Sequence, residues 1–302
     1  MAADTHVWTG ATNGNWGTAG NWDTGAVPES GDTVVLENNA VSINAGLDQN
    51  AVTLAALTIK SSYTGQIGLA RSSAPNDYLK ISATTINIGQ GEGNGSGRIK
   101  INTGTVQTAL NLYVSGTRAE TGIPAMLWKG THVANTATVN RGDLGAAFYA
   151  GETAAIATLN VGYINSVASD SSVVCGSGTT LTTINKIGGS LTIQSNSVTI
   201  TQSAGELSIA GTGTVTTLNI DGGTGYYESS GTCTTANVTG TLDFRRDMRA
   251  RTVTQLNVYR GASVSDPGAT VALTNGIDAI RCGLRDVSLD FGEHRTWTPS
   301  AI

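Results

Sequence analysis

The chain has 302 residues and a net charge of −5, with only 13% charged residues but 39% hydrophobic ones. The acidic balance argues against a general nucleic-acid binder, which needs a basic surface, and no apolar run is long enough to predict a membrane-spanning helix. The 39 glycines and the many threonines, valines and isoleucines favour an all-β fold of short strands joined by tight turns.

The first 32 residues are set apart by their tryptophans. The opening Met-Ala-Ala-Asp-Thr-His lacks the basic and apolar regions of a signal peptide, so we expect no export by that route. Trp8, Trp16 and Trp22 then follow within 15 positions. Large aromatic rings can cover the open end of a β fold and block edge pairing. We therefore predict a Trp-rich cap or arm over residues 1–32, with a sugar-binding aromatic platform as the alternative.

The order of residues in this segment carries a resemblance to a known group. Asn precedes two of the tryptophans, and Pro28, Gly31, Asp32 and Val34 follow them. Over residues 7–36 this resembles the start of β-helical bacterial surface proteins of the autotransporter and haemagglutinin-like kind, and of some phage structural proteins. The resemblance implies a β-solenoid that begins near Thr33, and it implies little about function.

A short strand unit recurs through the middle of the chain. It consists of Thr or Ala, an aliphatic residue, Asn or Thr, and a second aliphatic residue. The copies are Ala56–Ile59, Thr85–Ile88, Ala109–Leu112, Thr138–Asn140, Thr158–Val161, Thr183–Asn185, Thr217–Ile220, Thr235–Val238 and Gln255–Val258.

The spacing of these units favours stacking. Side chains of a strand alternate between its two faces, so both aliphatic residues of a unit point the same way. One such strand cannot bury its apolar face alone, whereas turns stacked on one another bury a continuous apolar column. We therefore predict a right-handed parallel β-helix (β-solenoid) over residues 33–260. The alternative is a β-sandwich or jelly roll, which favours hairpins and closer strand spacing.

Several segments between the units are predicted to form the rest of each turn. Leu191–Ile193, Val198–Ile200 and Leu207–Ile209 read as strands on the other faces. Residues 89–97 alternate glycine with polar residues, which predicts a mobile loop leaving the turn and no nucleotide site. Residues 71–77 and 118–124 are further candidate excursions.

The C-terminal segment, residues 261–302, loses the unit and is predicted to be a cap or docking segment. Eight of the arginines lie at or after position 245, interspersed with aspartates. Arginine forks suit carboxylate pairing at a protein interface, although local salt bridges on a solvated face would explain them equally well. The interface candidates are Trp8, Trp16, Trp22, Arg245, Arg246, Arg249, Arg251, Arg281 and Arg285.

Catalytic, cofactor and metal sites are not predicted. The three histidines and three cysteines are widely spaced and match no metal or disulfide pattern. The best candidate for polysaccharide cleavage is the cluster Asp243, Arg245, Arg246, Asp247 and Arg249, in which the side chains at 243, 245, 247 and 249 would share one face of a strand.

A structural function is therefore expected. The first hypothesis is a non-enzymatic virion protein of a tailed phage, a capsid decoration (cement) protein on the capsid exterior that binds the major capsid protein or other virion proteins. We expect a homotrimer without direct contact to nucleic acid or membrane. The alternatives are a bacterial cell-surface adhesin and, second, a polysaccharide-active enzyme.

Overall fold

The computed structural model describes residues 3–71, 77–162, 171–280 and 282–292. Within these ranges the chain forms 24 β-strands and two short 3₁₀ helices. No helix in the described ranges is long and apolar enough to cross a membrane. The chain divides into two compact units, residues 1–159 with 170–179 and residues 160–169 with 180–302, and each is described by itself.

The first unit is built from parallel strands that pair turn on turn. β1 pairs with β2, β2 with β3, β3 with β4, β4 with β6 and β6 with β8, always in parallel. A second stack runs through β4, β5, β7, β9 and β11. The strands are β1 (Thr5–Val7), β2 (Thr33–Leu36), β3 (Asp48–Lys60), β4 (Leu79–Gln90), β5 (Ile99–Gly104), β6 (Ala109–Leu112), β7 (Met126–Gly130), β8 (Thr136–Val139), β9 (Asp143–Ala146), β10 (Ala154–Val161) and β11 (Ser172–Cys175), and η1 covers Ala19–Asn21.

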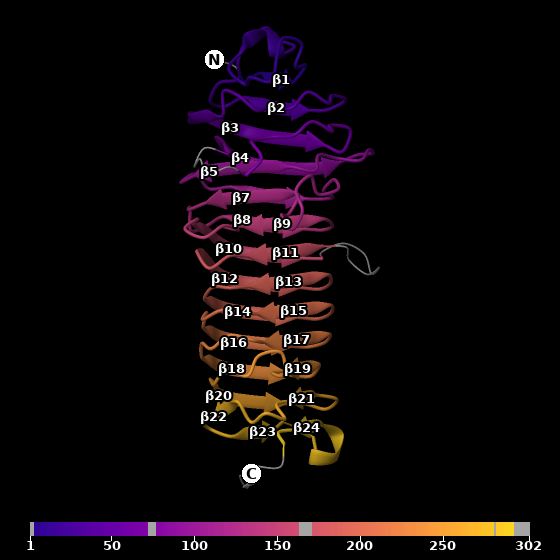
Figure 1. Ribbon diagram of the computed structural model, residues 1–302, viewed down its shortest axis with the longest axis vertical. Helices are drawn as coiled ribbons and strands as arrows, with labels where there is room; N and C mark the ends of the chain where they lie inside the picture. Colours follow the sequence, from indigo (N-terminus) through magenta and orange to yellow (C-terminus); the bar gives the residue numbers. More distant parts are fainter. Residues whose placement is uncertain (1–2, 72–76, 163–170, 281, 293–302) are drawn as a thin grey trace. The chain divides into compact units, whose positions relative to one another are not determined.

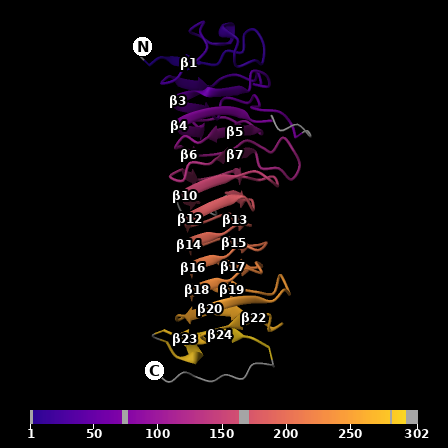
Figure 2. The same ribbon diagram turned by 90° about the vertical axis from the view of Figure 1, so that its left-hand side faces the viewer.

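The second unit repeats the same plan with shorter turns. Figure 1 shows β14, β16 and β18 stacked above one another, and Figure 2 shows β15, β17 and β19 each beside the strand that precedes it. One turn thus contributes one strand to each of two parallel stacks. The elements are β12 (Thr179–Lys186), β13 (Ser190–Ile193), β14 (Ser197–Gln202), β15 (Glu206–Ile209), β16 (Val215–Ile220), β17 (Thr224–Tyr227), β18 (Cys233–Val238), β19 (Thr241–Asp243), β20 (Arg251–Val258), β21 (Ser263–Ser265), β22 (Val271–Leu273), β23 (Ile277–Ala279), η2 (Leu284–Asp286) and β24 (Ser288–Asp290).

This pairing is that of a parallel β-solenoid, because strands one turn apart lie side by side. The named strands of the described ranges pair in parallel, which the β-sandwich or jelly-roll alternative would not do. The pairing also includes strands outside residues 33–260, since β1 pairs with β2 and β24 pairs with β21.

The repeated aliphatic residues form the core, as their spacing predicts. In the second unit Ile200, Leu218, Ala236 and Leu256 follow one another in register and are fully buried. Burying a Leu or Ile side chain contributes roughly 1.5–3 kcal/mol. The intervening Thr and Asn residues lie half-buried on the outside of the same strands.

Two predictions about register are wrong. Val198–Ile200 does not form another face of the turn, because β14 lies in register between β12 and β16, with Thr201 where its neighbours carry Asn185 and Asn219. In β8, Thr138 rather than Asn140 pairs with Asn111. The unit therefore recurs more regularly than its asparagines alone indicate.

In the segment 89–97, predicted to leave the turn, residues 91–94 are exposed, whereas residues on both sides of them hydrogen-bond to neighbouring turns. The amide of Gly95 donates to the Ser61 carbonyl at 2.8 Å, and the amide of Ala119 donates to the Gly97 carbonyl at 2.9 Å. A Cβ on Gly93 would lie 2.2 Å from the Ser61 carbonyl oxygen. The glycines thus permit close approach of successive backbones.

Candidate functional sites

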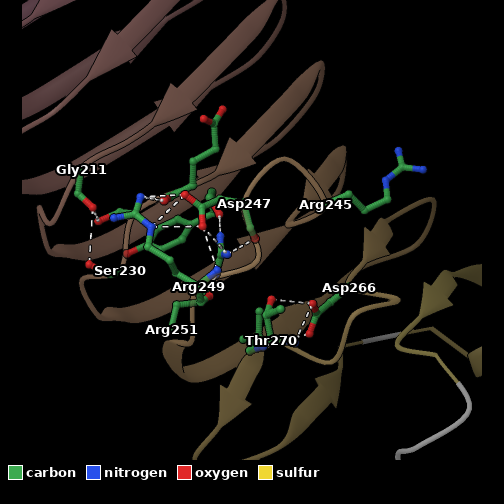
Figure 3. A network of polar contacts seen from close by, with 12 residues as sticks. Gly211, Ser230, Arg245, Asp247, Arg249, Arg251, Asp266 and Thr270 are labelled. Atoms are coloured by element: carbon green, nitrogen blue, oxygen red, sulfur yellow. Dashed lines mark hydrogen bonds and ion pairs between the residues drawn. The ribbon is translucent and has the colours of Figure 1, made fainter.

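The arginine loop, residues 244–250, follows β19 and precedes β20. The prediction that positions 243–249 share one face of a strand is wrong, because the strand ends at Asp243. The loop instead folds so that two arginines reach back to carboxylates of the same segment. Figure 3 shows Arg249 and Arg251 gathered around Asp247, whereas Arg245 points away from them.

Two Asp-x-Arg triplets have the same construction. Arg245 Nη2 lies 2.6 Å from Asp243 Oδ2, and the Arg245 amide donates to Asp243 Oδ1 at 2.8 Å. In the second triplet, Arg249 Nη2 lies 2.7 Å from Asp247 Oδ2, and the Arg249 amide donates to Asp247 Oδ1 at 2.8 Å. Each carboxylate therefore fixes both the backbone and the guanidinium of the arginine two positions later.

The electrostatics of both aspartates follow from these contacts. Hydrogen bonds from the side chain and then the amide of Arg249 lower the pKa of Asp247 to about 2. Burial alone would raise the pKa of Asp243, but the hydrogen bonds and charge of Arg245 outweigh it and lower that pKa. Neither carboxyl is suited to the role of general acid, which needs a raised pKa.

The side chain of Arg246 contacts the outer face of the stack formed by β13, β15, β17 and β19 in the second unit. Its Nη1 lies 2.9 Å from Glu206 Oε1 and 3.8 Å from Glu228 Oε1. Its guanidinium carbon lies 3.1 Å from the centroid of the Tyr226 ring, a cation–π contact. The sequence gives no direct signal for these three partners, because Glu206 is 40 positions away.

Arg251 differs from the other arginines of the segment because its side chain is buried. Its guanidinium donates to the Tyr227, Asp247 and Arg249 carbonyls. We interpret Arg251 as the anchor that holds the loop on the stack. Among the remaining predicted arginines, Arg285 lies exposed on η2, and Arg281 lies outside the described residues.

Met248 is the most exposed large apolar side chain of the second unit's described residues. It is 68% exposed, between Arg246 and Arg249, whose side chains are 42% and 51% exposed. A Cβ on Gly268 would lie 2.6 Å from the Met248 methyl carbon, so the methionine rests over that glycine. The loop thus presents an apolar tip among arginines whose orientation is fixed.

The three predicted tryptophans are buried at 1%, 0% and 3% exposure. The Trp22 ring packs edge-to-face against Trp8 at 5.1 Å and against Trp16 at 4.8 Å. Trp22 Nε1 donates to the Trp16 carbonyl, and Trp8 Nε1 donates to the Val41 carbonyl. A partner would meet the residues around these rings, and an interface role of the tryptophans themselves stays a prediction.

His6 links β1 to Thr24 and Asp32, which follow the tryptophans in sequence. Its Nε2 lies 3.0 Å from Asp32 Oδ2, and its Nδ1 lies 2.7 Å from the Thr24 hydroxyl. The Thr24 hydroxyl, the His6 imidazole and the Asp32 carboxylate follow one another in the order of nucleophile, base and orienting group in a catalytic triad. However, the amides of Gly25 and Ala26 already donate within the segment and are not available to an oxyanion. We interpret the three side chains as a structural tie.

A second polar cluster, centred on Glu152, lies in the first unit. Glu152 Oε2 accepts hydrogen bonds from the Tyr78 hydroxyl and from the Tyr149 amide, both at 3.1 Å. Its Oε1 lies 3.1 Å from Lys129 Nζ, which also stands 4.0 Å above the Tyr78 ring. One carboxylate therefore joins three segments of the unit.

Glu120 continues this cluster. Its Oε1 lies 3.4 Å from Lys100 Nζ, and its Oε2 accepts the Arg71 amide at 3.0 Å. The Arg71 guanidinium stacks 3.8 Å from the Tyr149 ring centroid. Lys100 is 1% exposed, and this burial lowers its pKa although Glu120 opposes the shift.

The tyrosines of the cluster are also perturbed. Burial, with the nearby carboxylates, raises the pKa of Tyr78 and of Tyr149. Strongly perturbed groups gather at functional sites, and structural ion-pair networks perturb them as well. A depression of about 270 Å³ adjoins Tyr78 and is also lined by residues 44–48 and Lys80. No sequence motif indicates this cluster, although residues 118–124 were among the predicted excursions.

In the described part of the chain, no group of three or more His, Cys, Asp or Glu side chains is placed to hold a metal ion. Cys175 and Cys233 are free and buried, and burial raises the pKa of each thiol to about 12. Comparisons with family models, curated proteins and solved structures found no match.

Proposed function

We propose that the chain is a non-enzymatic structural protein of a tailed-phage virion, a decoration (cement) protein that binds the capsid exterior at junctions between capsomers. The observation that carries this proposal is the arginine loop. Met and Arg are enriched at protein interfaces, and the exposed Met248 lies in the same loop as two arginines that carboxylates hold in place. Fixed side chains lose little conformational entropy on binding.

In this proposal Met248 fills an apolar pocket of the major capsid protein or another virion protein, and the arginine forks meet carboxylates around it. Binding to the assembled shell but not to its dissociated form would stabilise the shell by mass action. We further propose a right-handed solenoid, the hand that parallel crossover connections favour, with the Trp-rich segment as its cap.

Capsids of the encoding phage, stripped of this chain, provide the test. Adding the chain should raise their melting temperature, and an unchanged melting temperature would contradict the cement proposal. Met248→Asp should weaken binding at least tenfold, since a buried hot-spot side chain carries about 2 kcal/mol or more. Val133→Asp is the matched control, because Val133 is 78% exposed in the other unit. Equal loss in both variants would contradict the assigned role of the loop.

A bacterial cell-surface adhesin would use the same kind of loop. The neighbouring genes separate the two hypotheses: capsid and portal genes support the virion protein, and a translocator gene supports the adhesin.

The polysaccharide-active alternative is favoured by one observation: Tyr78, whose pKa is raised, donates a hydrogen bond to Glu152 and lines the depression. If it holds, the chain lowers the viscosity of an acidic or neutral polysaccharide solution, and Glu152→Gln abolishes that loss while Asp247→Asn does not. Unchanged viscosity across a panel of such polymers would rule it out for that panel.

A further inference from the structure

The outer face of the first strand stack in the second unit carries a regular array of uncharged side chains. Thr183, Thr199, Thr217 and Thr235 lie in register on β12, β14, β16 and β18. A parallel column, two positions further along each strand, consists of Asn185, Thr201, Asn219, Asn237 and Asn257. We call these two columns the Thr/Asn face.

The asparagines of this face are tied to one another. Asn257 Nδ2 donates to Asn237 Oδ1 at 2.8 Å, Asn237 Nδ2 donates to Asn219 Oδ1 at 2.8 Å, and Asn219 Nδ2 donates to the Thr201 hydroxyl at 3.2 Å. This ladder fixes the side-chain rotamers before any partner arrives. The entropy that a partner would otherwise have to overcome is thereby reduced.

The ladder leaves hydrogen-bonding capacity on each amide. A side-chain amide has two N–H donors and an oxygen with two lone pairs. Asn219 and Asn237 each use one N–H and one lone pair along the ladder. A second such column can satisfy the remaining donors and acceptors, because an amide is complementary to itself.

Charge distinguishes this face from the other stack of the same unit. Neither column of the Thr/Asn face carries an ionisable side chain from β12 to β20, and Asp278 on β23 follows Asn257 in register. The other stack carries charged side chains: Glu206 and Asp243 pair with Arg246 and Arg245, and Asp290 is exposed. Two copies of an acidic chain repel each other less where their contact surfaces are neutral. Val198, 48% exposed beside Thr199, adds apolar area at the same place.

We propose that the Thr/Asn face is the contact between copies of this chain, with the Asn column of one copy packed against the same face of a second copy. The partner is thus a second copy of the chain. Matching ladders of amide and hydroxyl side chains, packed sheet against sheet, give dry and closely interdigitated interfaces. This self-association is independent of the capsid contact through the arginine loop.

The test is the molar mass of the full chain in solution, measured by light scattering after size exclusion. We expect twice the chain mass of 30.8 kDa, because a face that packs against its own equivalent closes as a two-fold pair. The double variant Thr217→Lys/Thr235→Lys should run as a monomer. Thr224→Lys/Thr241→Lys is the control, because these threonines are also half-buried and in register on neighbouring turns, but on the other stack. The control should keep the wild-type mass.

A monomeric wild type, or an oligomer that survives in the first double variant, would overturn the proposal. Two single cysteine variants test the contact even if the lysine double variant fails to fold. After oxidation, Thr217→Cys should form a covalent dimer on a denaturing gel, and Thr224→Cys should not. Equal cross-linking of both would also overturn it. Capsid melting with the wild-type chain remains a separate measurement, so failure of either proposal is recognised on its own.

Discussion

Lys186 occupies an inward position at the end of β12, where the turns that follow carry Gln202, Ile220 and Val238. The residue is fully buried, and its Nζ donates to the Ala204 carbonyl at 2.6 Å. Burial lowers the pKa of Lys186 to about 8, although Glu206 acts in the opposite direction. The column of Lys186, Gln202, Ile220 and Val238 thus begins with a lysine whose charged form is disfavoured by burial.

This placement predicts an unusual pH dependence. The unfolded chain holds the Lys186 proton up to about pH 10.4, whereas the folded chain releases it near pH 8. Stability should therefore rise as the pH increases from about 8 towards 10. Lys186→Met should remove this rise and raise the free energy of unfolding at pH 7 by roughly 1–4 kcal/mol, because it replaces a buried charge with an apolar chain.

Urea unfolding of both proteins at pH 7, 8 and 9 measures the difference, and the comparison cancels the titration of other groups. Lys60→Met is the control, since the Lys60 side chain is 42% exposed. Parallel stability curves for wild type and Lys186→Met would contradict the prediction.

At the scale of the element, the close approach of successive turns depends on particular glycines. Gly89 and Gly91 both have positive φ, +79° and +80°. A Cβ on Gly89 would lie 1.9 Å from the Val114 carbonyl oxygen, whereas a Cβ on Gly91 meets nothing within 4 Å. The pair therefore separates backbone strain from steric contact between turns.

Gly91→Ala should cost about 1–2 kcal/mol, the strain of a left-handed residue. Gly89→Ala should cost this amount plus the displacement of the β4 end from residue 114, and we expect a total above about 3 kcal/mol. Thermal unfolding of the two variants measures both terms. Equal melting temperatures would show that the turns are not in tight contact there.

At this scale, the segments that form strands were largely predictable from the sequence, whereas the pairing register between strands was not. Two aliphatic residues flanking one polar residue identify the buried columns, because a strand alternates its faces. The pattern failed at β14, where Thr201 replaces Asn, and at β8, where Thr138 and Asn140 are both compatible with the unit. Only pairing between turns decides which polar residue joins the column.

At the scale of the whole molecule, the candidate sites join residues that are far apart in sequence. Arg246 meets Glu206 across 40 positions, and Tyr78 meets Glu152 across 74. Because the turns differ in length, such contacts cannot be predicted from residue spacing in the sequence alone. By contrast, the two Asp-x-Arg triplets are local, and for that reason the sequence already indicated Asp243, Asp247 and their arginines.

The register of β16 on β18 has an evolutionary consequence. Val215 stands on Cys233 and Asn219 on Asn237, so residues 215–232 make one complete turn whose two ends meet equivalent neighbours. Duplicating that stretch in the gene would add one turn while keeping the strand register and the buried column at both junctions, and deleting it would remove one. Unequal recombination within the repeat can therefore change the length of this unit by whole turns without requiring a new arrangement of core residues.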